Sequence, residues 1–394
     1  MTMSTSNLFK LNWKDDSYYD AHPAEKELRD ACIERANWNT LREYASSRNS
    51  GRPCTLLEQS TIGSAHLIRL LRFENPTIDT DSALDAGTDI EPLWIARVNL
   101  TLSTPESESL LRYDLDAMDL IRSKTTVPVP KVYGYELSDD NAVRAAFTLM
   151  QVIPGFSVLD AEGAYGGRAP VDKRKRFIEK VAGIQVQLSS IRFPQIGKII
   201  RRLDGTFDID PFPSIGGPFS TASGFLETWA AQARPKAPIS ERTIRERLKY
   251  GPIEKQKEVL MSLREFPDKL EELARIVRNS RPESDSGPFP LYYSDLHQGN
   301  ILVDDEFGII GVLGWEGLCT MPWELVQPPP FISRSSRATG SPSDAEDPGS
   351  ADRLEEREEY VKILRQKEDE MGVDSKLSTI LGNDDIQALA RVCG

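Results

Sequence analysis

The chain has 394 residues, of which 39% are hydrophobic and 28% are charged, and this length and balance predict a globular protein of two lobes or domains. The formal net charge of −13 argues against a nucleic-acid binder, which normally carries a basic stripe, and is compatible with a cationic small ligand. The sequence holds no apolar run near the roughly 18 residues of a membrane span and no signal-peptide core, so we expect no membrane association and a cytoplasmic location. Four scattered cysteines predict free thiols.

Residues 1–50 are polar, and we expect them to form an N-terminal extension that packs on the first lobe, with helix-like patches at Ala24–Ala36 and Asn39–Ala45. Residues 51–153 predict a small first lobe, which contains one helix at Glu106–Lys124 with a buried apolar face. Alternating apolar positions predict its strands, at Cys54–Phe73 with a turn at Ile62–His66, and at Leu93–Leu100, Lys131–Leu137 and Ala145–Val152.

Residues 154–326 predict a second, mostly helical lobe. In Pro170–Ile191 apolar residues recur every three or four positions, so one face of this helix should be buried. Further helices are predicted at Phe225–Ala231 and at Arg242–Val277, where Pro267 should break or kink the helix.

The C-terminal part divides into two predicted segments. Residues 327–352, rich in proline and serine, predict a flexible linker. Residues 353–394 predict a helical segment with a charged, solvated face and a few core anchors such as Tyr360 and Leu364.

The stretch Ser294–Phe307 carries the most informative pattern of the chain. Asp295 and Asn300 have the D-x-x-x-x-N spacing of a kinase catalytic loop, in which the aspartate accepts the proton of a hydroxyl acceptor and the asparagine oxygen reaches a magnesium ion. This chemistry requires both side chains on one tight turn. The alternative for Asp295 is a turn aspartate that accepts backbone hydrogen bonds, and Asn300 could cap the same turn.

The residues after this loop predict a strand at Asn300–Val303, a polar turn, and a second strand at Ile309–Leu313. A kinase-like site needs a second metal-binding aspartate at the end of that second strand, but the residue there is Gly314, which has no metal-binding side chain. If the strand continues, Glu316 faces the same way as residue 314 and could supply the missing carboxylate. The alternative for Glu316 is a structural role beside Trp315.

The run Ser294–Glu316 resembles the aminoglycoside phosphotransferase family, and especially its fungal branch, whose pattern is His-x-Asp-x-x-x-x-Asn-Ile-x-Val-Asp followed by Gly-Val-Ile-Asp-Trp-Glu. The resemblance covers about residues 55–330 in the family's order. The other segments that carry it are Trp94–Val98, Thr125–Tyr133, Phe147–Gly155, Phe193–Gly197, Gly217–Phe219 and Cys319–Leu325.

This resemblance implies an α+β, two-lobed, protein-kinase-like fold. The first lobe would be a small antiparallel sheet that binds a nucleotide, and the mostly helical second lobe would carry the catalytic and substrate groups. The resemblance also implies ATP and Mg²⁺ as cofactors, Asp295 as the catalytic base, and Asn300, with Glu316 as a substitute, as metal ligands.

On the nucleotide side, the resemblance implies that Arg97 contacts phosphate and that Asp114 orients it, with Asp116 as a competing candidate for the acid. The alternative for Arg97 is a surface position at a strand edge. The other implied nucleotide-binding residues are Gly63 and Ser64 in a phosphate-covering turn, whose alternative is a plain hairpin, and Met150, Gln151 and Val152 beside the adenine.

Three residues depart from the family pattern, and all concern the catalytic constellation. Gly314 replaces an aspartate, Tyr293 replaces the first histidine of the catalytic loop, and Asp114 stands where glutamate is usual. The implied function is ATP- and Mg²⁺-dependent phosphoryl transfer to a hydroxyl of a small molecule, with choline-like, sugar or amino-alcohol acceptors among the alternatives. The rival interpretation is a catalytically impaired pseudokinase that serves as a binding or interaction module.

Overall fold

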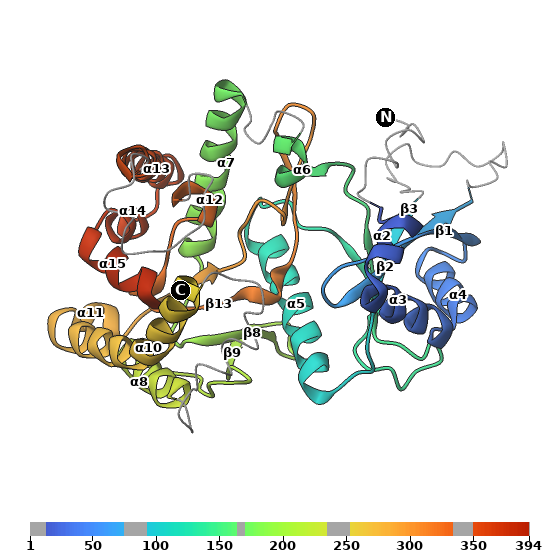
Figure 1. Ribbon diagram of the computed structural model, residues 1–394, viewed down its shortest axis with the longest axis horizontal. Coiled ribbons are helices and arrows are strands. Elements are labelled where there is room, and N and C mark those ends of the chain that lie inside the picture. Colours follow the sequence, from blue (N-terminus) through green and yellow to red (C-terminus); the bar gives the residue numbers. More distant parts are fainter. Residues whose placement is uncertain (1–12, 75–92, 164–169, 235–252, 334–349, 394) are drawn as a thin grey trace.

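The computed structural model describes residues 13–74, 93–163, 170–234, 253–333 and 350–393 (Figure 1). It confirms the predicted α+β, two-lobed architecture: one lobe is built on an antiparallel sheet and the other is dominated by helices. In Figure 1 the sheet lobe and the helix-rich lobe lie on opposite sides of α5 (Pro105–Lys124).

The first lobe contains a five-stranded antiparallel sheet in the order β1-β2-β3-β5-β4. Its strand β3 (Leu93–Asn99) shows why the sequence pattern succeeded, because Trp94, Ala96 and Val98 are buried while Arg97 on the opposite face is half-buried. The other strands are β1 (Cys54–Ile62), β2 (His66–Phe73), β4 (Val132–Glu136) and β5 (Phe147–Gln151).

Helices in the described N-terminal residues 13–50 pack on the first lobe. Tyr19, Leu41 and Ala45 belong to the same buried cluster as Trp94 and Phe147 of the sheet. The residues form a packed layer and not a loose extension. The helices are α2 (Asp16–Ala21), which the sequence did not predict, α3 (Pro23–Arg35) and α4 (Trp38–Arg48).

The helix α5 begins with a capping box, in which the Thr104 hydroxyl accepts from the Ser107 backbone N–H and the Ser107 hydroxyl accepts from the Thr104 backbone N–H. Its predicted buried face is confirmed, since Leu111, Leu115, Met118 and Ile121 are all buried. Met118 and Ile121 belong to the main core of the second lobe, so α5 packs against both lobes.

The second lobe combines helices with two small sheets, ordered β7-β10-β13-β8-β9 and β12-β11-β6. The predicted amphipathic helix is α7 (Val171–Ser190), and Phe177 and Val181 on its inner face are buried. The strands are β6 (Phe156–Ser157), β7 (Arg192–Phe193), β8 (Gly197–Arg201), β9 (Phe207–Asp210), β10 (Phe289–Tyr293), β11 (Ile301–Val303), β12 (Ile309–Val312) and β13 (Leu318–Thr320).

The remaining helices are α6 (Val158–Gly163), α8 (Ala222–Ala233), α10 (Ile253–Ser280), α11 (Pro282–Asp285), α12 (Pro330–Ser333), α13 (Ser350–Met371), α14 (Lys376–Leu381) and α15 (Asp384–Cys393), with 3-10 turns η1 (Trp315–Gly317) and η2 (Trp323–Leu325). Pro267 lies inside α10, which continues through it, so the predicted break at Pro267 is wrong. Residues 242–252 of the predicted helix and 334–349 of the predicted linker lie outside the described residues.

The C-terminal helices join the core of the second lobe. Tyr360 and Leu364 of α13 are buried, as predicted, in the cluster that also holds Phe177 and Trp315. The Tyr360 hydroxyl donates to Gln185 Oε1 on α7 at 2.9 Å. The C-terminal segment is therefore an integral layer of this lobe.

Two further sequence predictions concern the whole chain. Cys32, Cys54 and Cys319 are free and buried, as the scattered cysteines predicted. Across the described ranges, none of the helices combines the length and the apolar character that a membrane crossing requires.

Candidate active site

The predicted catalytic loop lies between β10 and β11 and forms the tight turn that its spacing requires. The Asn300 side-chain amide donates to Asp295 Oδ2 at 2.8 Å and to the Asp295 carbonyl at 3.0 Å. Two backbone hydrogen bonds close the turn, from His297 N to Asp295 O and from Asn300 N to His297 O. The structure thus brings together the two residues that the sequence singled out, and their catalytic roles stay predictions.

His297 adds a contact that the sequence did not reveal. Its Nε2 lies 3.4 Å from Asp295 Oδ1, while its Nδ1 accepts the backbone N–H of Gly299 at 3.0 Å. Because Nδ1 is the acceptor, the neutral ring carries its proton on Nε2 and points it toward Asp295. Asp295 is therefore oriented from two sides, by Asn300 and by His297, and half of its side chain remains exposed. A histidine two residues after an aspartate is the sole sequence signal for this arrangement.

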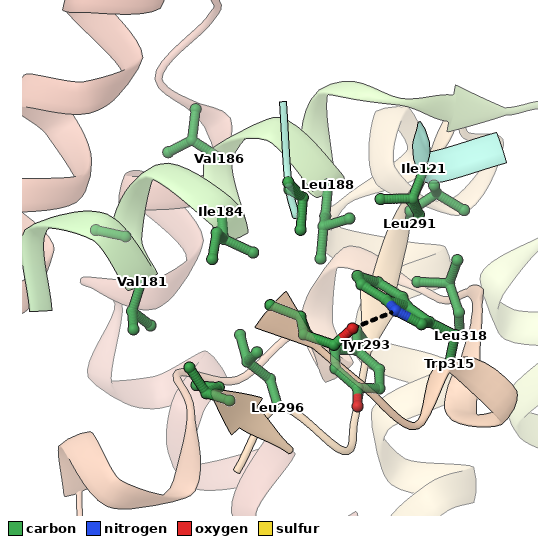
Figure 2. Packing of buried hydrophobic residues seen from close by; sticks show 14 of the residues in the cluster. Ile121, Val181, Ile184, Val186, Leu188, Leu291, Tyr293, Leu296, Trp315 and Leu318 are labelled. Carbon is green, nitrogen blue, oxygen red and sulfur yellow. Dashed lines mark hydrogen bonds between the residues drawn. The ribbon is translucent and has the colours of Figure 1, made fainter. Parts of the chain in front are cut away.

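Tyr293 connects the catalytic loop to the segment that contains Gly314. Its buried hydroxyl donates to the Leu313 carbonyl at 2.5 Å and accepts from the Asn300 amide at 3.1 Å. The ring stacks on Trp315, with centroids 4.8 Å apart, and Figure 2 shows the two side chains together at one end of the core. Burial raises the pKa of Tyr293 well above its usual range, so the hydroxyl stays protonated and able to donate.

Gly314 adopts a left-handed conformation, with φ +73° and ψ +46°. A Cβ placed on this residue would lie 2.8 Å from Asn300 Nδ2 and 3.2 Å from Asn300 Oδ1, so the Asn300 amide stands over the position where a side chain would begin. Aspartate and asparagine tolerate this backbone region better than most residues. A side chain at 314 would therefore project directly at Asn300.

Glu316 does not stand where the continued strand would have put it. The strand β12 ends at Val312, and Trp315–Gly317 forms a 3-10 turn, so the same-face relation of residues 314 and 316 is wrong. The left-handed Gly314 ends the extended backbone. The Glu316 side chain is exposed, and its charge contributes to raising the pKa of Asp114.

The donor groups around Asn300 do not fit a magnesium site of the expected kind. Mg²⁺ is usually held by one or two carboxylates together with substrate phosphates. Here the amide of Asn300 is neutral, residue 314 has no side chain, and the Asp295 carboxylate is engaged by Asn300 and His297. Within the described part of the chain no group of three or more His, Cys, Asp or Glu side chains is placed to hold a metal ion.

In the first lobe, Arg97 of β3 lies between Asp114 of α5 and His66 at the start of β2. Its Nη1 is 3.4 Å from Asp114 Oδ2, and its Nη2 is 3.3 Å from His66 Nδ1. The β2–β3 register pairs Arg97 with Ile68, which sets His66 on the diagonal within reach of a long side chain. The competing acid Asp116 instead accepts the backbone N–H of Arg201.

Burial dominates the electrostatics of this triad. It raises the pKa of Asp114 from 3.8 to about 6; Arg97 opposes the rise and the charge of Glu316 adds to it. Burial and the neighbouring guanidinium lower the pKa of His66 from 6.5 to about 3, so the imidazole is neutral and can accept from Arg97. A guanidinium held in this way by two neighbours is a suitable partner for phosphate, because its planar fork can bind two phosphate oxygens.

The two remaining predicted groups lie at the turn after β1 and at the interlobe segment. Gly63 and Ser64 are exposed in the β1–β2 hairpin, where Gly63 N donates to His66 O at 2.9 Å, and a Cβ on Gly63 would meet nothing within 4 Å. Met150 is buried in β5, Gln151 N donates to the Lys131 carbonyl, and Val152 follows the end of that strand.

Gly155 follows Val152 in the chain and packs closely against the backbone of β11. A Cβ on Gly155 would lie 2.7 Å from the Val303 carbonyl, so this close approach of backbone to backbone requires glycine. Of the predicted nucleotide-binding residues, the structure brings Arg97 and Asp114 into contact, and the binding roles of all of them remain predictions.

Comparison with known proteins gives one match that spans most of this region. Residues 94–324 match a model of the family described as "Phosphotransferase enzyme family" (APH). A curated protein named "Altered inheritance of mitochondria protein 9, mitochondrial", from Zygosaccharomyces rouxii, is 30% identical over 117 residues, which are 28% of this chain and 19% of that protein. The chain therefore matches less than a fifth of the length of this relative.

Similar solved structures include a thermostable mutant of an aminoglycoside phosphotransferase, which is 13% identical with a TM-score of 0.40 and covers 89% of this chain and 98% of that one. An ethanolamine kinase from Plasmodium vivax is 12% identical with a TM-score of 0.39 and covers 98% of this chain and 92% of that one. These likenesses are too distant to support a functional conclusion. The match to the family model, by contrast, spans more than half of the chain and includes Arg97, Asp114 and the Asp295–Asn300 loop. The chain therefore belongs to the phosphotransferase enzyme family.

Proposed function

We propose that this chain transfers a phosphoryl group from ATP to a hydroxyl of a small molecule, at a rate strongly reduced by Gly314. The hydrogen-bonded pair Asp295 and Asn300, inside the family-matched region, carries this proposal. Asp295 accepts the proton of the attacking hydroxyl. Asn300 and His297 hold the carboxylate in position, and half of its surface is open to an incoming hydroxyl.

The first lobe supplies the phosphate contacts in this proposal. Arg97 binds phosphate through its guanidinium, while Asp114 and neutral His66 fix its orientation. The exposed backbone of Gly63 and the hydroxyl of Ser64 cover the phosphates from the β1–β2 turn. ATP binds in this arrangement between the lobes, with Met150, Gln151 and Val152 bordering the adenine.

The residues expected to bind a metal ion, at Asn300 and position 314, support this proposal least. In relatives that use Mg²⁺, the ion neutralises charge on the phosphates, but the donors present here do not fit it, so no step is assigned to a metal. Catalysis of this reaction depends on positioning and electrostatic stabilisation, and a missing carboxylate removes part of both. Gly314 therefore favours a second candidate function, a pseudokinase that binds ligands on an intact scaffold without transferring phosphate.

The experiment that separates the two candidates compares the wild type with Gly314→Asp in ATP titrations with and without Mg²⁺, followed by thermal unfolding and by transfer from labelled ATP. A ligand that binds only the folded state raises Tm. We expect little Mg²⁺-dependent shift in the wild type and a clear shift, with faster transfer, in the variant. The Asn300 side chain must yield slightly to the new Cβ, which lies at its amide end.

Gly372→Asp is the matched control. Gly372 also has positive φ, +65°, and a Cβ there would meet nothing within 4 Å, so this variant repeats the backbone strain away from the site. If Gly314→Asp folds as well as Gly372→Asp, yet neither it nor the wild type transfers phosphate to any of a broad panel of alcohols, phosphoryl transfer is wrong and the binding function remains.

A further inference from the structure

A cavity in the second lobe adjoins the catalytic loop. Its volume is about 760 Å³, within the range of small-molecule sites. Ser294 and Leu296, the two neighbours of Asp295, line it, and so does Gly317. A Cβ on Gly317 would lie 3.3 Å from Ser294 Oγ and 3.5 Å from Asp295 Cβ, so this end of the cavity lies next to Asp295, the residue proposed to receive the hydroxyl proton, although Asp295 itself does not line it.

The wall farther from the loop is aromatic and aliphatic. Phe212, Phe225 and Trp229 follow one another at centroid distances of 5.6 and 5.5 Å, and Ile215 and Met321 also line the cavity. Phe225 and Trp229 lie one helical turn apart on α8, so their rings come from the same helix. Such a surface favours an apolar or aromatic ligand body.

The charge of this lining is the opposite of that of the whole chain. Although the net charge is −13, the described residues that line the cavity include no aspartate or glutamate, and Lys198 is the single charged side chain among them. Lys198 Nζ donates to the Glu316 carbonyl at 2.8 Å and lies 3.5 Å from the Leu318 carbonyl. These contacts hold its ammonium in the wall beside Gly317, close to the catalytic loop.

We propose that this cavity is the acceptor site and that it takes an apolar, hydroxyl-bearing compound without positive charge. This inference rests on the proposed phosphoryl transfer. A polyamine or quaternary ammonium acceptor would bury positive charge among apolar side chains and beside Lys198, where the described lining offers no carboxylate to compensate it, which is costly. The net charge of the chain was compatible with a cationic acceptor. The lining of this cavity instead favours a neutral or anionic apolar alcohol.

The test uses three alcohols of one skeleton that differ in charge: 1-(2-naphthyl)ethane-1,2-diol, 2-amino-1-(2-naphthyl)ethanol and 2-hydroxy-2-(2-naphthyl)acetate. Each competes with the fluorescent apolar anion 8-anilinonaphthalene-1-sulfonate on the full chain, without nucleotide, and choline and kanamycin are measured beside them. We expect the diol and the hydroxy acid to displace the dye at concentrations at least tenfold lower than the amine. Equal or better displacement by the amine, choline or kanamycin, or failure of the dye to bind, overturns the proposal.

Two variants tie the preference to the cavity. Ile215→Glu puts a carboxylate into its half-buried wall, and we expect it to remove or reverse the discrimination against the amine. Leu203→Glu adds the same charge at a fully exposed position of the same lobe and should leave the order of the alcohols unchanged. An unchanged order in folded Ile215→Glu places the dye elsewhere and overturns the assignment.

Transfer from labelled ATP separates this inference from the function on which it rests. If the diol displaces the dye in both wild type and Gly314→Asp but neither protein phosphorylates it, phosphoryl transfer fails while the ligand class of the cavity stands. If Gly314→Asp phosphorylates kanamycin or choline in preference to the naphthyl diol, phosphoryl transfer stands and the acceptor class is wrong.

Discussion

Single side chains at this site perform more than one task, and Asn300 shows it best. Its amide holds Asp295, contacts the Tyr293 hydroxyl, and stands over Gly314. Tyr293, which departs from the family's histidine, in turn donates to the Leu313 carbonyl. The substitution that the sequence marked as a loss thus ties the catalytic loop to the backbone immediately before Gly314.

The first prediction concerns Tyr293→Phe. The ring keeps its stacking on Trp315, but the Leu313 carbonyl loses the donor that the buried Tyr293 hydroxyl supplies, and Asn300 loses an acceptor. We expect a loss of about 1–2 kcal/mol in the free energy of unfolding, measured with urea. Tyr135→Phe, at an exposed position of β4, should change it by less than about 0.5 kcal/mol. Equal effects of the two substitutions would contradict the role assigned to the Tyr293 hydroxyl.

Asp114 gives a prediction about pH. Its pKa rises from 3.8 in the unfolded chain to about 6 in the fold, so the folded protein binds the extra proton between these values. This group therefore stabilises the fold fully below pH 3.8, and its contribution is lost as the pH rises through about 6. We expect the stability of Asp114→Asn relative to wild type to increase from pH 4 to pH 6.5 and then level off. A flat difference across this range, from urea unfolding at each pH, would show that the carboxyl is not perturbed.

At the scale of elements, periodic segments were predictable and backbone reversals were not. The helices α5 and α7 carry apolar residues at regular spacing along one face. This spacing alone is enough to predict the helix and its buried face from the sequence. The 3-10 turn Trp315–Gly317 escaped prediction because a single left-handed glycine ends the strand, and the sequence Gly314-Trp315-Glu316 has no period from which to read it.

The same distinction applies to the candidate site. The spacing of Asp295 and Asn300 is local and predicted their contact, whereas the contact of Arg97 with His66 depends on strand register. The choice of Asp114 over Asp116 depends on which lobe each side of α5 faces, since Asp116 binds the Arg201 backbone. Tertiary placement of this kind has no short-range signature.

The C-terminal helices provide the prediction at this scale. Leu364 of α13 is fully buried in the second-lobe core, so Leu364→Ala should cost about 2–5 kcal/mol of unfolding free energy for the whole lobe. Lys362→Ala, two residues earlier on the exposed face, is the control and should be nearly neutral. Urea unfolding followed by circular dichroism measures both. A small early transition in Leu364→Ala, with the rest unaffected, would mean that the C-terminal segment folds by itself.

At the scale of the whole molecule, α5 links the two lobes. It follows β3 in the chain, presents Asp114 to Arg97, and packs Met118 and Ile121 into the second-lobe core. Its outer side is tied to β8, where Asp116 Oδ2 accepts the Arg201 backbone N–H at 2.9 Å. Asp119 forms an ion pair with the Arg201 side chain, also at 2.9 Å.

These ties predict that the lobes open together. In native-state hydrogen exchange under mild urea, the slowest amides of β3 and β10 should converge on one opening free energy. Asp116→Ala leaves the Arg201 N–H without this acceptor and should lower that value by about 1 kcal/mol in both strands. Asp116→Asn keeps an acceptor oxygen and is the control. If Asp116→Ala destabilises β10 alone, the lobes unfold independently. The contacts of α5 would then not couple the two lobes.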